Sequence, residues 1–287
     1  MKTIGIVPNY DKPAAMDFVK DIAEYIKSKG CKPVLAYNIA EFTNLQEFGV
    51  SKYELYSKSD FIIVLGGDGT LLNTGRKAAK YGTPLLGINM GTLGFLAAAE
   101  GTDAHETIDK VLNGEYKLEK RLMLESEILS ADGDAPKTYK AVNDVCISRG
   151  VFTKVTSYRI YVNDEYVATF RADGMIVSTP TGSTAYNLSA GGPVLKPDIA
   201  CMVITPICAH SLHSRSIVVS ADDVIRIDAS FGANGDIIMS MDGQTSVILN
   251  NGDSICVKKS EYDVNIIKTN KIGFYDILRK KLISKGE

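Results

Sequence analysis

The strongest constraint on the fold is an apolar run that ends abruptly at glycines. Residues 61–65 are Phe-Ile-Ile-Val-Leu, and residues 66–70 are Gly-Gly-Asp-Gly-Thr, followed by a helical pattern. An apolar run bounded by turn residues is typical of a strand buried on both faces, as in a parallel sheet. Asp68 therefore follows the carboxyl end of a strand, which is the edge where open α/β sheets bind their ligands.

The residues around this run alternate between strand and helix patterns. Short apolar runs, typical of buried strands, occupy residues 4–7, 34–36 and 84–88, whereas helical spacing is found over residues 13–29, 71–80 and 103–112. Strands that alternate with helices indicate an open parallel sheet. We therefore predict an α/β lobe of the Rossmann-like type over residues 1–114.

From residue 115 the pattern changes to short strand-like runs separated by turn residues. Asn163 and Asp164 divide two of these runs and predict a hairpin. So dense a series of strands predicts an all-β, sandwich-like second lobe over residues 115–267. Residues 268–287 return to helical spacing, and we expect this helix to pack back on the first lobe.

Length and composition narrow the class of protein. A chain of 287 residues favours two domains, and a net charge of -2 lacks the basic excess that nucleic-acid binding needs. The five cysteines form no C-x-x-C pair, which predicts free thiols in a reducing cytosol. The N-terminus has too short an apolar run for a signal peptide, and no run is long enough to span a membrane. We expect a cytoplasmic protein that binds neither nucleic acid nor membrane.

The glycine turn has the chemistry of a phosphate cradle, formed by Gly66, Gly67 and Thr70. Glycines let backbone N–H groups approach phosphate oxygens, and the helix that follows presents its positive N-terminal end. The turn lacks the Gly-Lys-Ser/Thr of a Walker A loop and the G-x-G-x-x-G of a Rossmann fingerprint. In the alternative interpretation the glycines make only a tight turn and Asp68 caps the helix. The run resembles a signature shared by NAD kinases, diacylglycerol and sphingosine kinases and, with a final Ser, phosphofructokinases, so it indicates a superfamily and no particular substrate.

A second segment, residues 173–193, is crowded with hydroxyls, glycines and prolines. Its many hydrogen-bonding groups suit a polar ligand such as a nucleoside, although a Ser- and Thr-rich turn of a β lobe would have a similar composition. This run resembles the long glycine-rich motif of the NAD kinase family. Residues 89–95, 141–145 and 241–244 resemble further segments of that family. The resemblance runs from about residue 62 to residue 244.

The resemblance implies a two-domain kinase of the NAD kinase/diacylglycerol kinase type. Such an enzyme transfers a phosphoryl group from ATP, or from polyphosphate, to the 2′-hydroxyl of the adenosine ribose of NAD. Asp68 would be the general base, and Gly69 would help to hold the nucleotide. Mg²⁺ or another divalent cation would accompany ATP, without a fixed protein metal site and without a tightly bound organic cofactor. The family also implies a homo-oligomer, either a dimer or a tetramer.

The same resemblance assigns residues of the second lobe to NAD. Asn143 and Asp144 match positions that hold the substrate, although most relatives carry Glu at the second position. A plain Asn-Asp turn remains the alternative. Arg171 and Lys154 match ligand contacts but could equally be solvated surface groups. The remaining assigned or further contact positions are Phe95, Asp173, Thr184, Ala185, Tyr186, Asn187, Leu188, Ser189 and Gln244.

Other reactive side chains do not form recognisable sites. His210 and His213 lack a third ligand and an H-E-x-x-H pattern, so we expect no metal there. Ser178 and Ser183 lack a His-Asp partnership, which argues against a hydrolase triad. Two alternatives to an NAD kinase remain open: a lipid kinase that shares the glycine turn, and a non-catalytic NAD sensor.

Overall fold

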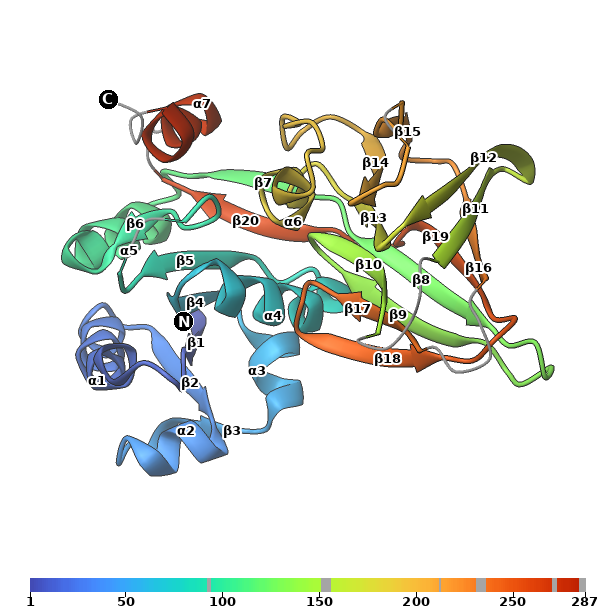
Figure 1. The fold of residues 1–287 in the computed structure, drawn as a ribbon. Coiled ribbons are helices and arrows are strands. Elements are labelled where there is room, and N and C mark those ends of the chain that lie inside the picture. Colours follow the sequence, from blue (N-terminus) through green and yellow to red (C-terminus); the bar gives the residue numbers. More distant parts are fainter. Residues whose placement is uncertain (92–93, 151–155, 212, 231–235, 270–272, 284–287) are drawn as a thin grey trace. The chain divides into compact units, whose positions relative to one another are not determined.

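The computed structural model describes residues 1–91, 94–150, 156–211, 213–230, 236–269 and 273–283 (Figure 1). The chain forms two units, Met1–Lys120 with Asp263–Glu287, and Arg121–Tyr262. The first is an α/β lobe with a parallel sheet, and the second is an all-β lobe of antiparallel sheets. The predicted fold class is therefore confirmed.

Within the described residues the first unit contains an eight-stranded sheet ordered β3-β2-β1-β4-β5-β20-β7, with β6 paired to β5. The chain moves outward from β1 to β2 and β3, then returns to β4 and continues to β5 on the other side. The strand order therefore reverses between β1 and β4, where open α/β sheets bind ligands. The strands are β1 (Thr3–Pro8), β2 (Lys32–Ala36), β3 (Gly49–Val50), β4 (Phe61–Gly66), β5 (Leu85–Asn89), β6 (Ala99–Glu100), β7 (Lys117–Arg121) and β20 (Val264–Lys268).

Helices cover both faces of this sheet. Apolar side chains of α1 (Pro13–Ser28), α2 (Tyr37–Phe42) and α5 (Ala104–Leu112) share one core with β1, β4 and β5. On the other face, α4 (Asp68–Ala78) lies so close that Leu71 packs directly over Gly87 and Gly75 packs against Val264. α3 (Lys52–Lys58) begins with a capping box between Ser51 and Glu54. The helix predicted over residues 71–80 corresponds to α4, which begins three residues earlier than predicted, at Asp68.

The lobe boundaries differ from the predicted ones because of β20. Residues 263–267, which we assigned to the β-rich lobe, belong to the first unit, where Ile266 pairs with Leu85 in a parallel ladder. A short apolar strand has the same sequence pattern in a parallel and in an antiparallel sheet, so the sequence of β20 could not show that it pairs with β5. Residues 115–120 also belong to the first unit, as do α7 (Phe274–Leu278) and the π-helical turn Arg279–Ile283.

The second unit is a sandwich of two antiparallel sheets, ordered β15-β14-β13-β10-β17-β18 and β12-β11-β16-β19-β8-β9 among the described residues. Inward-facing side chains of both sheets form one core that includes Tyr158, Met175 and Ile255. The strands are β8 (Leu124–Leu129), β9 (Lys137–Ala141), β10 (Asp144–Arg149), β11 (Thr156–Val162), β12 (Glu165–Ala172), β13 (Gly174–Ser178), β14 (Cys201–Ile207), β15 (Ile217–Ser220), β16 (Ile225–Ser230), β17 (Ile237–Met241), β18 (Thr245–Leu249) and β19 (Ser254–Lys259).

Two features of this unit bear on the sequence analysis. Asn163 and Asp164 have φ angles of 50° and 65°, as a tight hairpin between β11 and β12 requires, so that hairpin is confirmed. β9 and β10 are separate strands because Val142 and Asn143 interrupt the extended structure between them. This break places Asn143 at the end of a strand, where its side chain can serve a site.

All five cysteines are free thiols, of which Cys146 and Cys201 are buried and Cys208 is exposed. Within the described part of the chain, the helices are too short or too polar to cross a bilayer.

The contact between Gly87 and α4 gives a first prediction. A Cβ at residue 87 would overlap Leu71 and crowd the backbone of Ala97. Gly87→Ala should lower the free energy of unfolding by about 1–3 kcal/mol, measured by urea denaturation, because a packed core tolerates overfilling poorly. Gly67→Ala is the control, since nothing lies within 4 Å of its Cβ position. Equal stability of the two variants would contradict this packing.

Candidate functional site

Three polar side chains lie at the carboxyl edge of the sheet, where the strand order reverses. Asn9 follows β1, Asp68 follows β4, and Asn89 ends β5 directly opposite Gly66. A Cβ on Gly66 would overlap Thr70 and press on Asn9, so the turn needs glycine at this position. The N-terminal end of α4, an eleven-residue helix, opens toward the same edge. Backbone N–H groups of a first helical turn can bind phosphate oxygens there.

Asp68 does not cap its own helix. The residue in the cap position is Gly67, and the cap makes no side-chain hydrogen bond. Instead, the Asp68 carboxylate accepts hydrogen bonds from the N–H groups of Phe95 (2.8 Å) and Leu96 (3.1 Å), in the loop after β5. A Cβ on Gly94 would overlap this carboxylate. The structure therefore contradicts the capping interpretation and shows the Asp68 carboxylate held by a neighbouring loop.

The loop after β5 is the segment that the sequence analysis matched as residues 89–95, of which residues 92 and 93 lie outside the described structure. Asn89 is buried and its Nδ2 donates to the carbonyl of Gly91 (2.5 Å). The amino group of Lys12, just after β1, lies beside Gly91. Lys12 was missed by sequence reasoning, since the first sixty residues matched the family only in their strand-helix pattern. It supplies a cation at this edge.

In the second unit, Asn143 and Asp144 lie where β10 begins, between the ends of β13 and β17. The carboxylate of Asp242 accepts hydrogen bonds from three consecutive backbone N–H groups: Val142 (3.0 Å), Asn143 (2.7 Å) and Asp144 (3.2 Å). Asp242 has a φ of 52° in the turn between β17 and β18. The matched Asp-Gly-Gln turn thus acts on the Asn-Asp segment through Asp242, a residue that the sequence analysis did not select.

The glycine- and hydroxyl-rich segment holds the same backbone from the other side. The N–H of Thr179 donates to the carbonyl of Asn143 (2.8 Å), and its hydroxyl donates to the carbonyl of Val142 (2.7 Å). A Cβ on Gly182 would overlap the Asn143 carbonyl, so the two segments are in direct contact. Three of the predicted motifs therefore form one constellation at one edge of a sheet.

Within residues 184–189 the structure separates exposed from internal groups. Asn187 is fully buried; its Nδ2 donates to the carbonyls of Ser183 and Pro193, and its Oδ1 accepts from the hydroxyl of Thr205. This side chain holds the loop in shape. Tyr186 and Ser189 are exposed, whereas Thr184, Ala185 and Leu188 are half-buried.

The remaining predicted positions are less concentrated. Asp173 is half-buried, and its Oδ1 lies 2.7 Å from Nε of Arg149, a partner that the sequence analysis missed. Arg171 is exposed on β12, and Gln244 is exposed in the turn after β17. Lys154 lies outside the described residues.

Burial gives Asp144 an unusual electrostatic state. Its side chain is 4% exposed, and desolvation together with the nearby charge of Asp242 raises the pKa of the Asp144 carboxyl to about 7. At neutral pH this group is divided between its protonated and ionised forms. It can therefore donate as well as accept a hydrogen bond.

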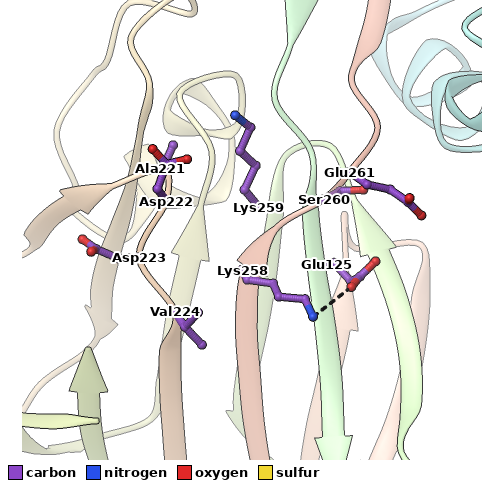
Figure 2. A pocket seen from close by; sticks show the side chains of 9 residues that line it. All are labelled: Glu125, Ala221, Asp222, Asp223, Val224, Lys258, Lys259, Ser260 and Glu261. Carbon is purple, nitrogen blue, oxygen red and sulfur yellow. Dashed lines mark ion pairs between the residues drawn. The ribbon is translucent and has the colours of Figure 1, made fainter. Parts of the chain in front are cut away.

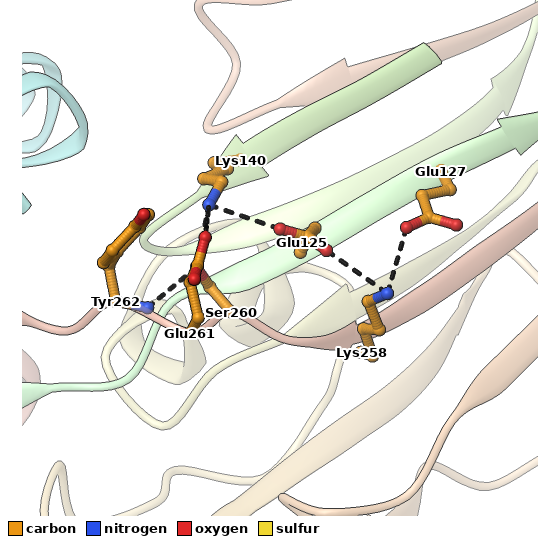
Figure 3. Close-up of polar contacts among 7 residues, drawn as sticks. All are labelled: Glu125, Glu127, Lys140, Lys258, Ser260, Glu261 and Tyr262. Atoms are coloured by element: carbon orange, nitrogen blue, oxygen red, sulfur yellow. Dashed lines mark hydrogen bonds and ion pairs between the residues drawn. The ribbon is translucent and has the colours of Figure 1, made fainter. Parts of the chain in front are cut away.

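A cavity of about 580 Å³ in the second unit is lined by a different set of residues (Figure 2). Glu125, residues 221–224 and residues 258–261 surround it, and none of them is a predicted site residue. Its lysine Lys258 lies 3.3 Å from Glu125 and 3.0 Å from Glu127, and Lys140 lies 3.2 Å from Glu125 (Figure 3). Lys258 and Lys140 are thus engaged with acidic side chains, and the second lysine of the lining, Lys259, is exposed.

A glycine turn at the carboxyl edge of an α/β lobe, together with a hydroxyl-rich constellation on a β-sandwich lobe, is the combination that the sequence analysis predicts for a two-lobed phosphotransferase. Models of the ATP-NAD kinase N-terminal and C-terminal domains match residues 4–116 and 142–269. The chain belongs to the NAD kinase family. The NAD kinase of Caldanaerobacter subterraneus subsp. tengcongensis is 43% identical over 285 residues, covering 99% of this chain and 100% of the relative.

Further relatives and solved structures agree. The NAD kinase of Symbiobacterium thermophilum is 40% identical over 98% of this chain and 99% of its own length. An NAD kinase of Archaeoglobus fulgidus, solved in complex with ATP, superposes with a TM-score of 0.76 at 29% identity, covering 97% of this chain and 98% of that one. Yeast NADH kinase complexed with NADH superposes with a TM-score of 0.89, covering 99% and 88%; at 23% identity this likeness bears on the fold alone.

The raised pKa of Asp144 gives a prediction for stability without ligand. Ionising Asp144 costs free energy in the folded chain, so its contribution to stability is lost as pH rises from 3.8 to about 7. Asp144→Asn should therefore raise the free energy of unfolding by roughly 1–4 kcal/mol at about pH 8 and by less at about pH 5. Denaturation at both pH values measures this.

Asp109→Asn is the matched control, because the hydrogen bond from Lys29 lowers the pKa of Asp109. Its removal should give no gain in stability at the higher pH. A difference between Asp144→Asn and the parent that does not vary with pH would contradict the electrostatic assignment.

Proposed function

We propose that the protein transfers the γ-phosphoryl group of ATP to the 2′-hydroxyl of the adenosine ribose of NAD, giving NADP and ADP. The observation that carries this proposal is Asp68, whose carboxylate is held by two backbone N–H groups beside the N-terminal end of α4. Membership of the NAD kinase family supports the acceptor, and the ATP complex of the Archaeoglobus fulgidus relative supports the donor.

Asp68 would act as the general base. As the ribose oxygen forms its bond to the γ-phosphorus, the hydroxyl proton passes to the Asp68 carboxylate and the bond to the β-phosphate oxygen breaks, which releases ADP. Each Asp68 oxygen accepts one backbone hydrogen bond and keeps a lone pair for this proton. Because phosphoryl transfer depends chiefly on positioning and charge neutralisation, a carboxylate serves well as the base.

The glycine turn would bind the phosphates of the nucleotide. Nothing lies within 4 Å of the Cβ position of Gly67, Gly69 is exposed, and the hydroxyl of Thr70 lies against the buried Gly66. Lys12 adds a positive charge at the same edge. Mg²⁺ would be bound mainly by the donor phosphates, whose negative charge it would neutralise. Asp68 is the carboxylate within this turn.

The constellation of the second unit would bind NAD. Asp242 holds the backbone N–H groups of Asn143 and Asp144, and Thr179 holds the carbonyl of Asn143, so the backbone that carries both side chains is fixed. Asp144 is one methylene shorter than the Glu that most relatives carry, and its mixed protonation suits a hydroxyl, which both donates and accepts. The further proposed contacts are Phe95, Lys154, Arg171, Asp173, Thr184, Ala185, Tyr186, Leu188, Ser189 and Gln244, with Asn187 shaping the loop.

Donor and acceptor can be tested together in one assay. NAD, NADH and a diacylglycerol are offered as acceptors, with ATP and inorganic polyphosphate as separate donors, and ADP and NADP(H) are quantified. The proposal expects NADP from NAD and ATP. Phosphorylation of the lipid without NADP would favour a lipid kinase, and tight NAD binding without transfer from any donor would favour an NAD sensor.

We also propose a cytoplasmic homo-oligomer, either a dimer or a tetramer. The five free thiols suit a reducing compartment, and the family resemblance supports self-association.

Removing the base should affect turnover. Asp68→Asn is expected to lower kcat for NADP formation by about 10²- to 10⁴-fold, with a smaller change in the KM for either substrate. Asp109→Asn, a carboxylate on α5 of the same lobe, is the control with expected parental turnover. Undiminished kcat in Asp68→Asn would remove the general-base assignment.

Removing the Asn143 amide should act on binding instead. Asn143→Ala is expected to raise the KM for NAD by about tenfold or more, because two or more hydrogen bonds to the substrate are lost, whereas the KM for ATP stays near its parental value. Steady-state kinetics with each substrate varied in turn measures both. A rise in the KM for ATP alone would reassign this residue to the donor.

A further inference from the structure

Lys268 ends β20, the strand that the sequence analysis had placed in the other lobe. β20 runs parallel to β5, so the carboxyl ends of both strands lie at the same edge of the sheet. From there the amino group of Lys268 donates hydrogen bonds to the carbonyls of Leu96 (2.9 Å) and Ala97 (3.0 Å). Both acceptors belong to the loop that holds Asp68.

Leu96 connects Lys268 to Asp68 through its own backbone. Its N–H donates to Oδ1 of Asp68, and its carbonyl accepts from Lys268. The side chain of Leu96 is buried, which leaves the residue little freedom to rotate. A cation that binds two consecutive carbonyls thus fixes the two peptide groups that directly follow those whose N–H groups orient the Asp68 carboxylate, and the two sets are joined at the Cα of Leu96.

Residues that follow β20 in the sequence also contact this loop. Phe274 of α7 packs beside Phe95 with ring centroids 6.5 Å apart, and the amino group of Lys281 lies 4.8 Å from the centroid of the Phe95 ring. These contacts hold the side chain of Phe95, whereas Lys268 is bonded to the backbone of the loop. Lys268 is therefore the member of this group that anchors the backbone directly after the two N–H groups that bind Asp68.

We propose that Lys268 is a positioning residue for Asp68, acting through the loop over residues 95–97, so that the transfer step depends on a residue of the C-terminal strand. The proposal rests on the proposed function of Asp68. Lys268 makes no contact with the reacting atoms in this account, and its effect should therefore fall on the rate of transfer rather than on substrate binding.

The test compares Lys268→Met with Lys268→Arg, the latter keeping donors for both carbonyls. Lys268→Met should lower kcat by about 10- to 100-fold with little change in the KM for NAD or ATP, and Lys268→Arg should recover much of that loss. In an Asp68→Asn background, Lys268→Met should cost less than about twofold, because the group that it positions is gone. Lys58→Met, at an exposed position at the end of α3, is the control for loss of a surface lysine.

Hydrogen exchange supplies a readout that does not need activity. In Lys268→Met the Phe95 and Leu96 amides should exchange about tenfold or more faster than in the parent, while the amides of β4 stay protected. If the parent forms no NADP, the proposed function fails, and the exchange rates still decide the role of Lys268.

Three results would overturn the proposal. One is unchanged exchange at Phe95 and Leu96 in Lys268→Met. The second is an equal loss of kcat in the parent and in Asp68→Asn, which would show that Lys268 does not act through Asp68. The third is a loss confined to thermal stability or to KM, which would leave Lys268 a merely structural residue.

Discussion

The hydrogen bonds from Phe95 and Leu96 to Asp68 are the interaction on which the proposed chemistry of the first lobe depends. They join the turn after β4 to the loop after β5, two neighbouring parallel strands whose carboxyl ends lie at the same edge of the sheet. Gly94 is required because any side chain there would displace the carboxylate. The parallel sheet thereby presents Asp68 in one orientation beside the positive end of α4, which suits the general-base role that we propose for it.

In the second lobe a carboxylate, that of Asp242, also binds backbone N–H groups of the proposed site. Asp242 binds three successive N–H groups and so fixes the turn that carries Asn143 and Asp144. Burial raises the pKa of Asp144, and the nearby charge of Asp242 raises it further, so Asp242 both shapes the turn and contributes to its chemistry. In each lobe, hydrogen bonds between a carboxylate and backbone N–H groups fix the position of a residue that we propose to contact the substrate.

Local patterns predicted much of this molecule, and distant contacts did not follow from them. The run over residues 61–70 and the Asn163-Asp164 hairpin were predictable because their signals lie within a few residues. Asp242 escaped prediction because its contact with Asn143 spans 99 residues, and Lys268 because its contact with Leu96 spans 172. β20 was assigned to the wrong lobe because the sequence of a short apolar strand does not show which strand it pairs with.

The position of the transferred phosphate tests the central claim most directly. The protein is incubated with ATP and NAD, and the product is resolved by ³¹P NMR and by chromatography against 2′- and 3′-phosphorylated standards. The account predicts a phosphate on the 2′-oxygen of the adenosine ribose, formed in equal amount with ADP and absent when Asp68 is replaced by Asn. A phosphate at another position, or undiminished product from the Asp68→Asn protein, would contradict it.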